Sequence, residues 1–192
     1  QGMILRSDVL YKAVTSIDNF DKYHFIYPCP KGQIFEQKKA KEYSKKEGLI
    51  ILSGYYEGID ERLFSFFNID RVSMGNFVLS NGELPALMIA DSVLRYVPGV
   101  LGNPACAEED SIASGLVEGP QYTVPREENG VKVPDVVVSG NHAAIRNWRK
   151  KEALKETLFR KPNLFVNYDL KESEQEVIVD ILKGGTEWQR QR

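Results

Sequence analysis

Two charged residues have side chains that could take part directly in a reaction. Asp110 follows Glu108 and Glu109. Neighbouring acids and partial burial raise a carboxylate's proton affinity, so Asp110 is a candidate general base. Acidic runs of this kind are also typical of solvated linkers. Arg95 stands one turn before Pro98, where the dipole of a helix ordinarily favours a cation. The sequence pattern alone leaves both interpretations of each residue open.

Three short predicted strands lead into small or turn-forming residues. The segments are residues 24–27, 49–52 and 70–74. The turns that follow them lie around Cys29, Gly54 and Gly75. Ligands of open α/β sheets bind at the carboxyl ends of the strands, so this pattern predicts one shared pocket. The glycine-bracketed run at 54–62 fits a cofactor-lining loop, and it also fits a surface turn whose glycines supply positive φ.

Common nucleotide, hydrolase and metal motifs do not occur in the sequence. No GxGxxG follows a predicted strand, and neither GxxxxGK[ST] nor GxSxG is present. The only histidines are His24 and His142, and the only cysteines are Cys29 and Cys106. These residues lack the spacing of a structural zinc site, and the two cysteines do not suggest a disulfide framework. A nucleotide-like cofactor would need a loop of another architecture.

The elements around the predicted pocket indicate an α/β domain. Residues 35–46 predict a solvated surface helix, which completes a strand-helix-strand unit. Residues 49–52 are apolar on both faces, which predicts an interior parallel strand covered by helices. Residues 83–97 predict a helix that is apolar on nearly all sides, so we expect it to be buried.

The remainder of the chain predicts a linker and a small, mostly helical part. Residues 102–119 are acidic, small and irregular, which is typical of a linker or mobile loop. A helix is expected at 143–159, and Ser173 with Glu176 predicts a capping box for a last helix that ends at Gly184.

The helix at 143–159 belongs to the most basic stretch of the chain. Seven Lys and Arg residues stand against two Glu residues between positions 142 and 161. One face of the predicted helix gathers basic side chains, namely Arg146, Arg149, Lys150 and Arg160. This face could meet phosphates, or it could be a solvated face with local ion pairs.

Composition limits the classes of protein to which the chain can belong. With 192 residues, 42% hydrophobic and 27% charged, it predicts one medium or two small globular domains. The formal charge of −2 neither requires nor excludes a polyanionic partner. The longest nearly uncharged stretch, 84–100, is interrupted by prolines and charges, so we expect no membrane span. Without a charged-then-apolar leader, a cytoplasmic protein with reduced thiols is expected.

A series of short motifs runs through the chain in a fixed order. They are Gly2-Met3, YEGIDER at 56–62, SMGNFVL at 73–79, GELP at 82–85, PGVLGN at 98–103, Asp110-Ser111, Tyr122-Thr123, Val133-Pro134, SGNH at 139–142 and Trp148-Arg149. With nearly all spacings preserved over essentially the whole chain, this order resembles the bacterial tRNA (guanine-N1)-methyltransferase family, TrmD.

The resemblance implies an α/β protein of the SPOUT class, with a deep trefoil-knotted domain and a mainly parallel sheet. Its S-adenosylmethionine site is knotted, which accounts for the missing GxGxxG. The implied domains are a knotted domain at 1–103, a linker and mobile loop at 104–121, and a helical tRNA-binding domain at 122–192. The implied cofactor-binding residues are Tyr27, Pro28, Cys29, Pro30, Gly54, Tyr56, Glu57, Met74, Gly75, Asn76, Phe77, Val78, Leu79, Gly82 and Pro85.

The resemblance also assigns roles in the reaction. Asp110 becomes the general base that removes the proton from guanine N1, and Arg95 stabilises negative charge that builds on O6. The implied product is a tRNA methylated at the guanine immediately 3′ of the anticodon. A magnesium ion, a homodimer with a shared site, and RNA contacts from the basic helix are implied as well.

The sequence departs from the family pattern at several points. Family members normally begin several dozen residues earlier, so an amino-terminal part of the first domain is expected to be missing. Asn81 replaces a usual glycine, and Cys29 and Cys106 replace usual serines. Because Asn tolerates left-handed backbone, Asn81 need not distort its loop. Two alternatives remain: a knotted methyltransferase that acts on another RNA position, such as a ribose hydroxyl, and a non-catalytic RNA-binding paralogue.

Overall fold

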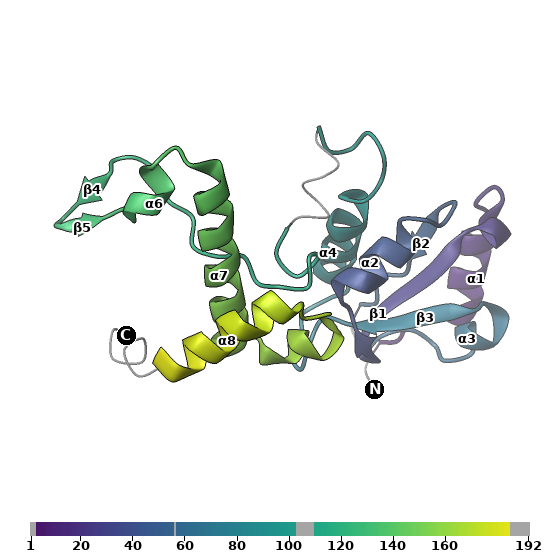
Figure 1. Ribbon diagram of the computed structural model, residues 1–192. Coiled ribbons are helices and arrows are strands. Elements are labelled where there is room, and N and C mark those ends of the chain that lie inside the picture. The colour runs from purple at the N-terminus through teal and green to yellow at the C-terminus, as the bar shows by residue number, and fades with distance from the viewer. Residues whose placement is uncertain (1–2, 56, 103–109, 185–192) are drawn as a thin grey trace. The chain divides into compact units, whose positions relative to one another are not determined.

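The computed structural model describes residues 3–55, 57–102 and 110–184 (Figure 1). The chain divides into two compact units, Gln1–Ala107 and Glu108–Arg192, which are described separately. This division leaves the predicted domain limits at 103 and 121 as predictions.

A parallel three-stranded sheet forms the centre of the first unit (Figure 1). Its strands are β1 (His24–Ile34), β2 (Leu49–Ile51) and β3 (Ile69–Ser73), in the order β2-β1-β3. This mixed α/β architecture agrees with the sequence prediction. The expectation that residues 49–52 form an interior strand is wrong for the described sheet, because β2 pairs only with β1 and lies at the edge.

Apolar side chains of the sheet alternate between two cores, as the two-residue period of a strand requires. Leu49 and Ile51 pack into one core, whereas Ile50 and Leu52 pack into the other. Both faces of β2 are therefore covered. The apolar run correctly predicted that both faces of the strand are buried, but it contained no information on whether the strand lies inside the sheet or at its edge.

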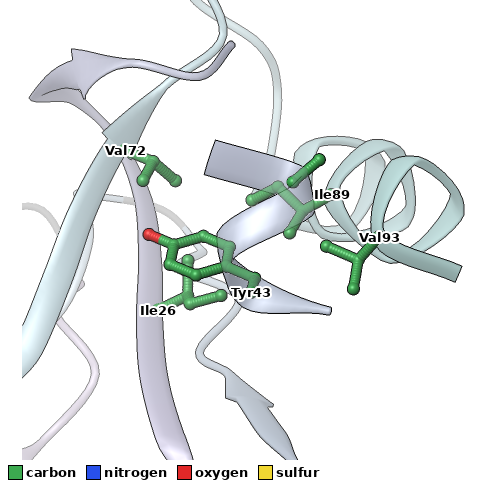
Figure 2. Close-up of a cluster of buried hydrophobic side chains, with 6 residues drawn as sticks. Ile26, Tyr43, Val72, Ile89 and Val93 are labelled. Atoms are coloured by element: carbon green, nitrogen blue, oxygen red, sulfur yellow. The ribbon is translucent and has the colours of Figure 1, made fainter. Parts of the chain in front are cut away.

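The first core lies between the sheet and two helices, α2 (Gln37–Tyr43) and α4 (Glu83–Leu94) (Figure 2). Ile26 and Val72 come from the sheet, Tyr43 from α2, and Ile89 and Val93 from α4. Ile26 and Ile89 are completely buried, so truncating either to Ala would cost about 2–5 kcal/mol. The helix predicted at 35–46 thus forms as a shorter helix that packs onto the sheet.

The second core lies on the opposite face of the sheet, with α1 (Ser7–Thr15), the 3-10 helix η1 (Phe20–Lys22) and α3 (Leu63–Phe66). Phe67 stacks on Tyr11 and on Phe25, with ring centroids 5.4 and 5.1 Å apart. Aromatic stacking of this kind adds to the burial of apolar area. Helices therefore cover the sheet on both faces.

Strand β1 is interrupted by a bulge where the sequence predicts its end. Pro28 pairs with Val72, and Gln33 pairs with the same Val72, so residues 29–32 loop out between them. A Cβ on Gly32 would lie 2.4 Å from the Val72 backbone nitrogen, so only glycine fits there. The prediction that the strand ends at Tyr27 is wrong, because the chain rejoins β3 after the prolines.

Helix α4 differs from the fully buried helix that its composition predicts. It ends at Leu94, and it buries one face through Pro85, Ile89 and Val93. The opposite face is open, with Leu84 58% and Leu87 66% exposed. An apolar helix can leave one face uncovered when only one layer packs against it.

The second unit is mostly helical. Its elements are the hairpin β4 (Glu127–Glu128) and β5 (Val131–Lys132), α6 (Asp135–Val138), α7 (His142–Arg160), the 3-10 helix η2 (Pro162–Asn167) and α8 (Glu172–Gly184). The helix expected at 143–159 is confirmed as α7, whose first turn is capped by the Asn141 side chain. None of the described helices is long and apolar enough to cross a membrane.

Helix α8 begins at Glu172, two residues earlier than the predicted capping box requires. The side chain of Glu174 accepts a hydrogen bond from the backbone N–H of Lys171 at 3.1 Å. Glu174 therefore makes the reciprocal contact that was expected from Glu176, and the pairing of Ser173 with Glu176 is wrong.

Candidate functional site

The carboxyl ends of the three parallel strands meet at one pocket in the first unit. β1 contributes Tyr27 and Pro28 together with the start of the bulge, β3 contributes its last two residues, and the loops after β2 and β3 close the remaining sides. The lining residues are Tyr27, Pro28, Cys29, Pro30, Gly54, Glu57, Gly58, Val72, Ser73, Met74, Gly75, Phe77, Val78, Leu79, Ser80, Asn81, Gly82 and Pro85. The three strand exits that the sequence singles out thus converge.

Most of the residues implied as cofactor-binding lie in this pocket. Asn76 is described but does not line it, and Tyr56 lies outside the described residues. Sequence reasoning missed five lining residues: Gly58, Val72, Ser73, Ser80 and Asn81. Gly58, Ser73, Ser80 and Asn81 each stand next to a predicted residue, and Val72 in β3 directly precedes the motif at 73–79, so adjacency to the quoted motifs is the signal that could have found them.

Two loops touch through their backbones at the inner wall of the pocket. The N–H of Gly82 donates a hydrogen bond to the carbonyl oxygen of Gly54 at 2.7 Å. A Cβ on Gly82 would lie 2.6 Å from the Gly54 nitrogen, a separation that real Cβ atoms do not adopt. Glycine at position 82 is therefore required for the close approach of the loops that follow β2 and β3.

Tyr27 fills the space behind the loop at 54–58. A Cβ on Gly54 would lie 2.9 Å from the Tyr27 hydroxyl, and one on Gly58 would lie 3.0 Å from it. Gly58 also has a φ of 107°, which L side chains rarely adopt. Burial is the main cause that raises the pKa of Tyr27 above its ordinary value, so its hydroxyl stays protonated at neutral pH.

The loop after β3 is fixed by local hydrogen bonds. The Ser73 hydroxyl accepts from the Gly75 N–H at 3.2 Å and donates to the Gly75 carbonyl at 3.1 Å. The Asn81 side chain accepts from the Glu83 N–H at 3.2 Å, which satisfies a donor of the first turn of α4. Asn81 does not belong to the described residues with positive φ. The ability of asparagine to adopt a left-handed backbone conformation is therefore not needed at this position.

The pocket combines small, apolar and polar neutral groups with one carboxylate. Glu57 is the only charged side chain among the described lining residues. A cationic ligand would therefore meet a favourable charge, while the apolar side chains from residues 74–79 offer contact area. No cluster of three or more His, Cys, Asp or Glu residues that could hold a metal occurs in the described parts of the chain, so the implied magnesium ion receives no support.

The two predicted catalytic residues lie in different units. Arg95 is the C-cap of α4, is partly buried, and does not line the pocket. Asp110 belongs to the second unit, where its carbonyl oxygen accepts from the Ser114 N–H at 3.2 Å. Their roles in the reaction stay predictions.

The described part of the acidic segment is held onto α7. The completely buried Thr157 hydroxyl accepts from the Val117 N–H at 2.8 Å. The Ser111 hydroxyl accepts from the Glu118 N–H at 2.7 Å, and Gly119 packs against the α7 backbone. Residues 110–119 therefore form an anchored turn rather than the irregular loop that their composition suggested, and residues 103–109 lie outside the described residues.

The basic residues predicted to bind RNA are all exposed, but two are already paired. Lys150 forms an ion pair with Glu174 at 2.8 Å and donates to the Tyr168 hydroxyl at 2.6 Å. Arg160 pairs with Glu156 one turn earlier on α7. Within the described residues, no ion pair involves Arg146 or Arg149, so these two are the better placed for an external anion.

Most of the chain is similar to known proteins of one family. The family model described as tRNA (Guanine-1)-methyltransferase TrmD matches residues 1–167. A tRNA (guanine-N(1)-)-methyltransferase of Bacillus licheniformis is 46% identical over 179 residues, which are 92% of this chain and 74% of that protein. Proteins of the same name from Bacillus subtilis and Staphylococcus aureus are 42% and 41% identical, over 99% and 93% of this chain and 76% and 73% of their own lengths.

Proposed function

The chain belongs to the TrmD family of tRNA (guanine-1)-methyltransferases, and from this premise we propose that it methylates N1 of the guanine 3′ of the anticodon, with S-adenosylmethionine as methyl donor. The observation that carries the proposal is the single pocket at the carboxyl ends of β1, β2 and β3. Residues implied as cofactor-binding by the sequence resemblance supply most of its wall.

The pocket suits a cationic nucleoside-like donor. Apolar and small side chains offer contact surface for a flat base, and Glu57 offers a charge opposite to that of a sulfonium. The close contact of Gly54 with Gly82 leaves backbone rather than side chains facing the ligand. When bound, the donor supplies an activated methyl group, so the task left to the protein is to align it with the acceptor.

The acceptor needs help from the protein, because N1 of neutral guanine carries a proton and is a poor nucleophile. We assign the removal of that proton to Asp110 and the stabilisation of negative charge on O6 to Arg95. The roles rest on the family resemblance together with the chemistry that each side chain can perform.

A homodimer is part of the proposal. The exposed face of α4 carries large apolar side chains, namely Leu84, Leu87, Met88 and Leu94. A contiguous apolar face of this kind is typical of an interface between proteins. A second copy of this chain would cover it, as the resemblance implies, and would bring a second subunit close to the loop that begins α4.

The knotted path of the chain and the tRNA-binding role of the second unit also belong to the proposal. The close backbone contact between the loops at Gly54 and Gly82 is compatible with one segment passing tightly against another. Arg146 and Arg149 on α7 provide exposed cations for phosphates. We place the enzyme in the cytoplasm, where tRNA is modified.

The test is to identify the methylated atom. The protein is incubated with bacterial tRNA and S-adenosylmethionine, and the tRNA is digested by nucleases and analysed by mass spectrometry. The expected product is 1-methylguanosine in the fragment just 3′ of the anticodon. A ribose-methylated product would favour the alternative knotted methyltransferase, and donor binding without any methylated product would favour a non-catalytic paralogue.

A further inference from the structure

One carboxylate outside the pocket lining joins two segments that continue into the pocket wall. Glu61 Oε1 accepts a hydrogen bond from Lys31 Nζ at 3.2 Å. Glu61 Oε2 accepts from an Arg71 guanidinium nitrogen at 2.5 Å. We call Lys31, Glu61 and Arg71 the charged clamp.

Each member of the charged clamp stands close in sequence to lining residues. Lys31 directly follows Pro30 in the bulge of β1. Glu61 lies a few residues after Gly58, which ends the loop that follows β2. Arg71 directly precedes Val72 on β3. The carboxylate therefore connects the bulge, the loop at 54–58 and the strand to which the bulge returns.

A second set of contacts links the charged clamp to the pocket through aromatic rings. The Arg71 guanidinium lies 3.7 Å from the centre of the Phe64 ring. Phe64 in turn contacts Tyr27 edge to face, with centroids 5.7 Å apart. The Tyr27 hydroxyl lies behind Gly54 and Gly58, so a shift of Arg71 would be transmitted to the same loop that Glu61 holds.

A neighbouring ion pair provides the contrast. Asp60 pairs with Arg62 two residues later, so the contact that Arg62 makes with this carboxylate stays within one segment of the chain. Both sets of contacts join a carboxylate to a guanidinium and include at least one well-exposed side chain. Of these two sets of contacts, only the charged clamp joins separate elements that contribute residues to the pocket wall.

We infer that Glu61 is a positioning residue, which holds the bulge at 29–32 and the loop at 54–58 at the separation needed to bind the methyl donor. The inference rests on the proposed function, because it takes S-adenosylmethionine as the ligand. Glu61 does not line the pocket, so its effect is on the shape of the binding wall.

The experiment compares Glu61→Gln with Arg62→Gln by titration calorimetry with S-adenosylmethionine. Each substitution replaces a charged side chain of the segment at 60–62 by a neutral amide, but Glu61→Gln removes two ion pairs between separate elements, whereas Arg62→Gln removes one ion pair within the segment. We expect the Kd of Glu61→Gln to rise about three- to fivefold at low salt, which is the upper part of the range for exposed ion pairs because two contacts are lost. The Kd of Arg62→Gln should match that of the wild type. In tRNA methylation, Glu61→Gln should raise the KM for the donor and leave kcat nearly unchanged.

Measurements at several salt concentrations, together with a second variant, distinguish a positioning role of Glu61 from a general loss of structure. High salt screens exposed ion pairs, so the affinity gap between wild type and Glu61→Gln should narrow as salt is raised. Lys31→Met, in an exposed part of the bulge, should weaken binding in the same direction. Combined with Glu61→Gln, it should add little, because both remove the same contact.

The possible outcomes are distinguishable. A wild type that shows no binding of S-adenosylmethionine would overturn the proposed function and this inference with it. Normal donor binding by both Glu61→Gln and Lys31→Met would overturn the positioning role alone. Equal weakening in Arg62→Gln and Glu61→Gln would also overturn it, since any disturbance of the segment at 60–62 would then reduce the affinity and the contacts of Glu61 would have no special role. If Glu61→Gln does not fold, Lys31→Met alone decides.

Discussion

The backbone N–H of Gly82 donates to the carbonyl oxygen of Gly54 across 2.7 Å, which ties the start of α4 to the loop that follows β2. No side chain could be placed between these two segments, because a Cβ on Gly82 would come within 2.6 Å of the Gly54 nitrogen and 3.0 Å of the Ser53 Cα. The inner wall of the pocket therefore requires glycine at position 82, because any larger residue would clash with the backbone of the loop that follows β2.

Gly82→Ala should separate the two loops and damage the pocket. The added methyl group meets backbone atoms, which cannot rotate away as a flexible side chain could. We expect a loss of about 1–3 kcal/mol in the free energy of unfolding, as for other overpacked sites, together with a large loss of affinity for S-adenosylmethionine. Thermal denaturation and calorimetry measure the two effects.

Gly184→Ala is the matched control, because a Cβ at that position meets no atom within 4 Å. It should leave both the melting temperature and the donor affinity unchanged. Unaltered stability and binding in Gly82→Ala would show that the loops can move apart, and that their contact does not shape the pocket.

Asp110→Asn should abolish methyl transfer and spare donor binding. The amide keeps the shape of the side chain but cannot take the proton from guanine N1. We expect kcat to fall by about 100-fold or more, the usual contribution of a general base, with the Kd for S-adenosylmethionine within about twofold of the wild type. Single-turnover methylation assays and calorimetry provide these values.

Asp180→Asn, an exposed acid on α8, serves as the control and should retain full activity. A normal rate in Asp110→Asn would mean that another group accepts the proton. That result would leave the methyltransferase identity intact and remove the role assigned to Asp110.

Much of the first unit follows from local patterns in the sequence. Apolar runs located β1 and β2, and small residues after all three strands located the pocket, because both signals depend on neighbours in the chain. The same local patterns predict that β1 ends at Tyr27, because they contain no information on the later pairing of residues 33 and 34 with β3. It also judged α4 buried from composition, although burial depends on how many layers surround a helix.

Contacts between distant segments had no signal in the sequence. The pairing of Lys31 and Arg71 with Glu61 exists only because the fold brings three elements together. The short hairpin of the second unit is different, because Asn129-Gly130 is a strong turn signal and both residues have positive φ. That signal was available and was not used.

A partly buried network at the other end of the sheet should make stability depend on pH. Asp70 Oδ2 accepts from the Tyr43 hydroxyl at 3.0 Å and contacts His24 Nε2 at 2.9 Å and Lys39 Nζ at 3.3 Å. Burial alone would raise the pKa of Asp70, but the hydrogen bonds from His24 and Tyr43 and the charge of Lys39 outweigh it and hold this pKa below its ordinary value.

Asp70→Asn should therefore destabilise the protein near neutral pH and matter less in acid. Because the folded pKa is lowered, the stabilisation is complete above the unfolded pKa of about 3.9 and is lost as pH falls through the folded value. We expect a gap of about 1 kcal/mol between wild type and Asp70→Asn at pH 6, closing below about pH 4. Urea denaturation at several pH values measures it, and a gap that stays constant with pH would contradict the network's ionic character.

Leu87→Glu should prevent the proposed dimer. Leu87 is the most exposed of the apolar residues on the open face of α4, so a charge there would be buried without a partner on association. Sedimentation analysis should give a dimer for the wild type and a monomer for Leu87→Glu at micromolar concentration. Val166→Glu replaces an apolar residue of the second unit that is even more exposed, and this variant should stay dimeric. A monomeric wild type would contradict the proposal.

Arg149→Ala and Lys150→Ala should act in different ways although the residues are adjacent on α7. Within the described residues Arg149 forms no ion pair, so its loss should weaken tRNA binding and reduce the slope of log affinity against log salt by about one. Lys150 pairs with the buried Glu174 and with Tyr168, so its loss should cost about 1–3 kcal/mol of stability because Glu174 loses a partner. Filter binding at several salt concentrations and thermal denaturation distinguish the two effects. Lys150→Ala could instead reduce the slope of log affinity against log salt as much as Arg149→Ala does, with unchanged stability. That result would mean that Lys150 leaves Glu174 to contact the RNA, and that the whole basic face of α7 takes part in binding.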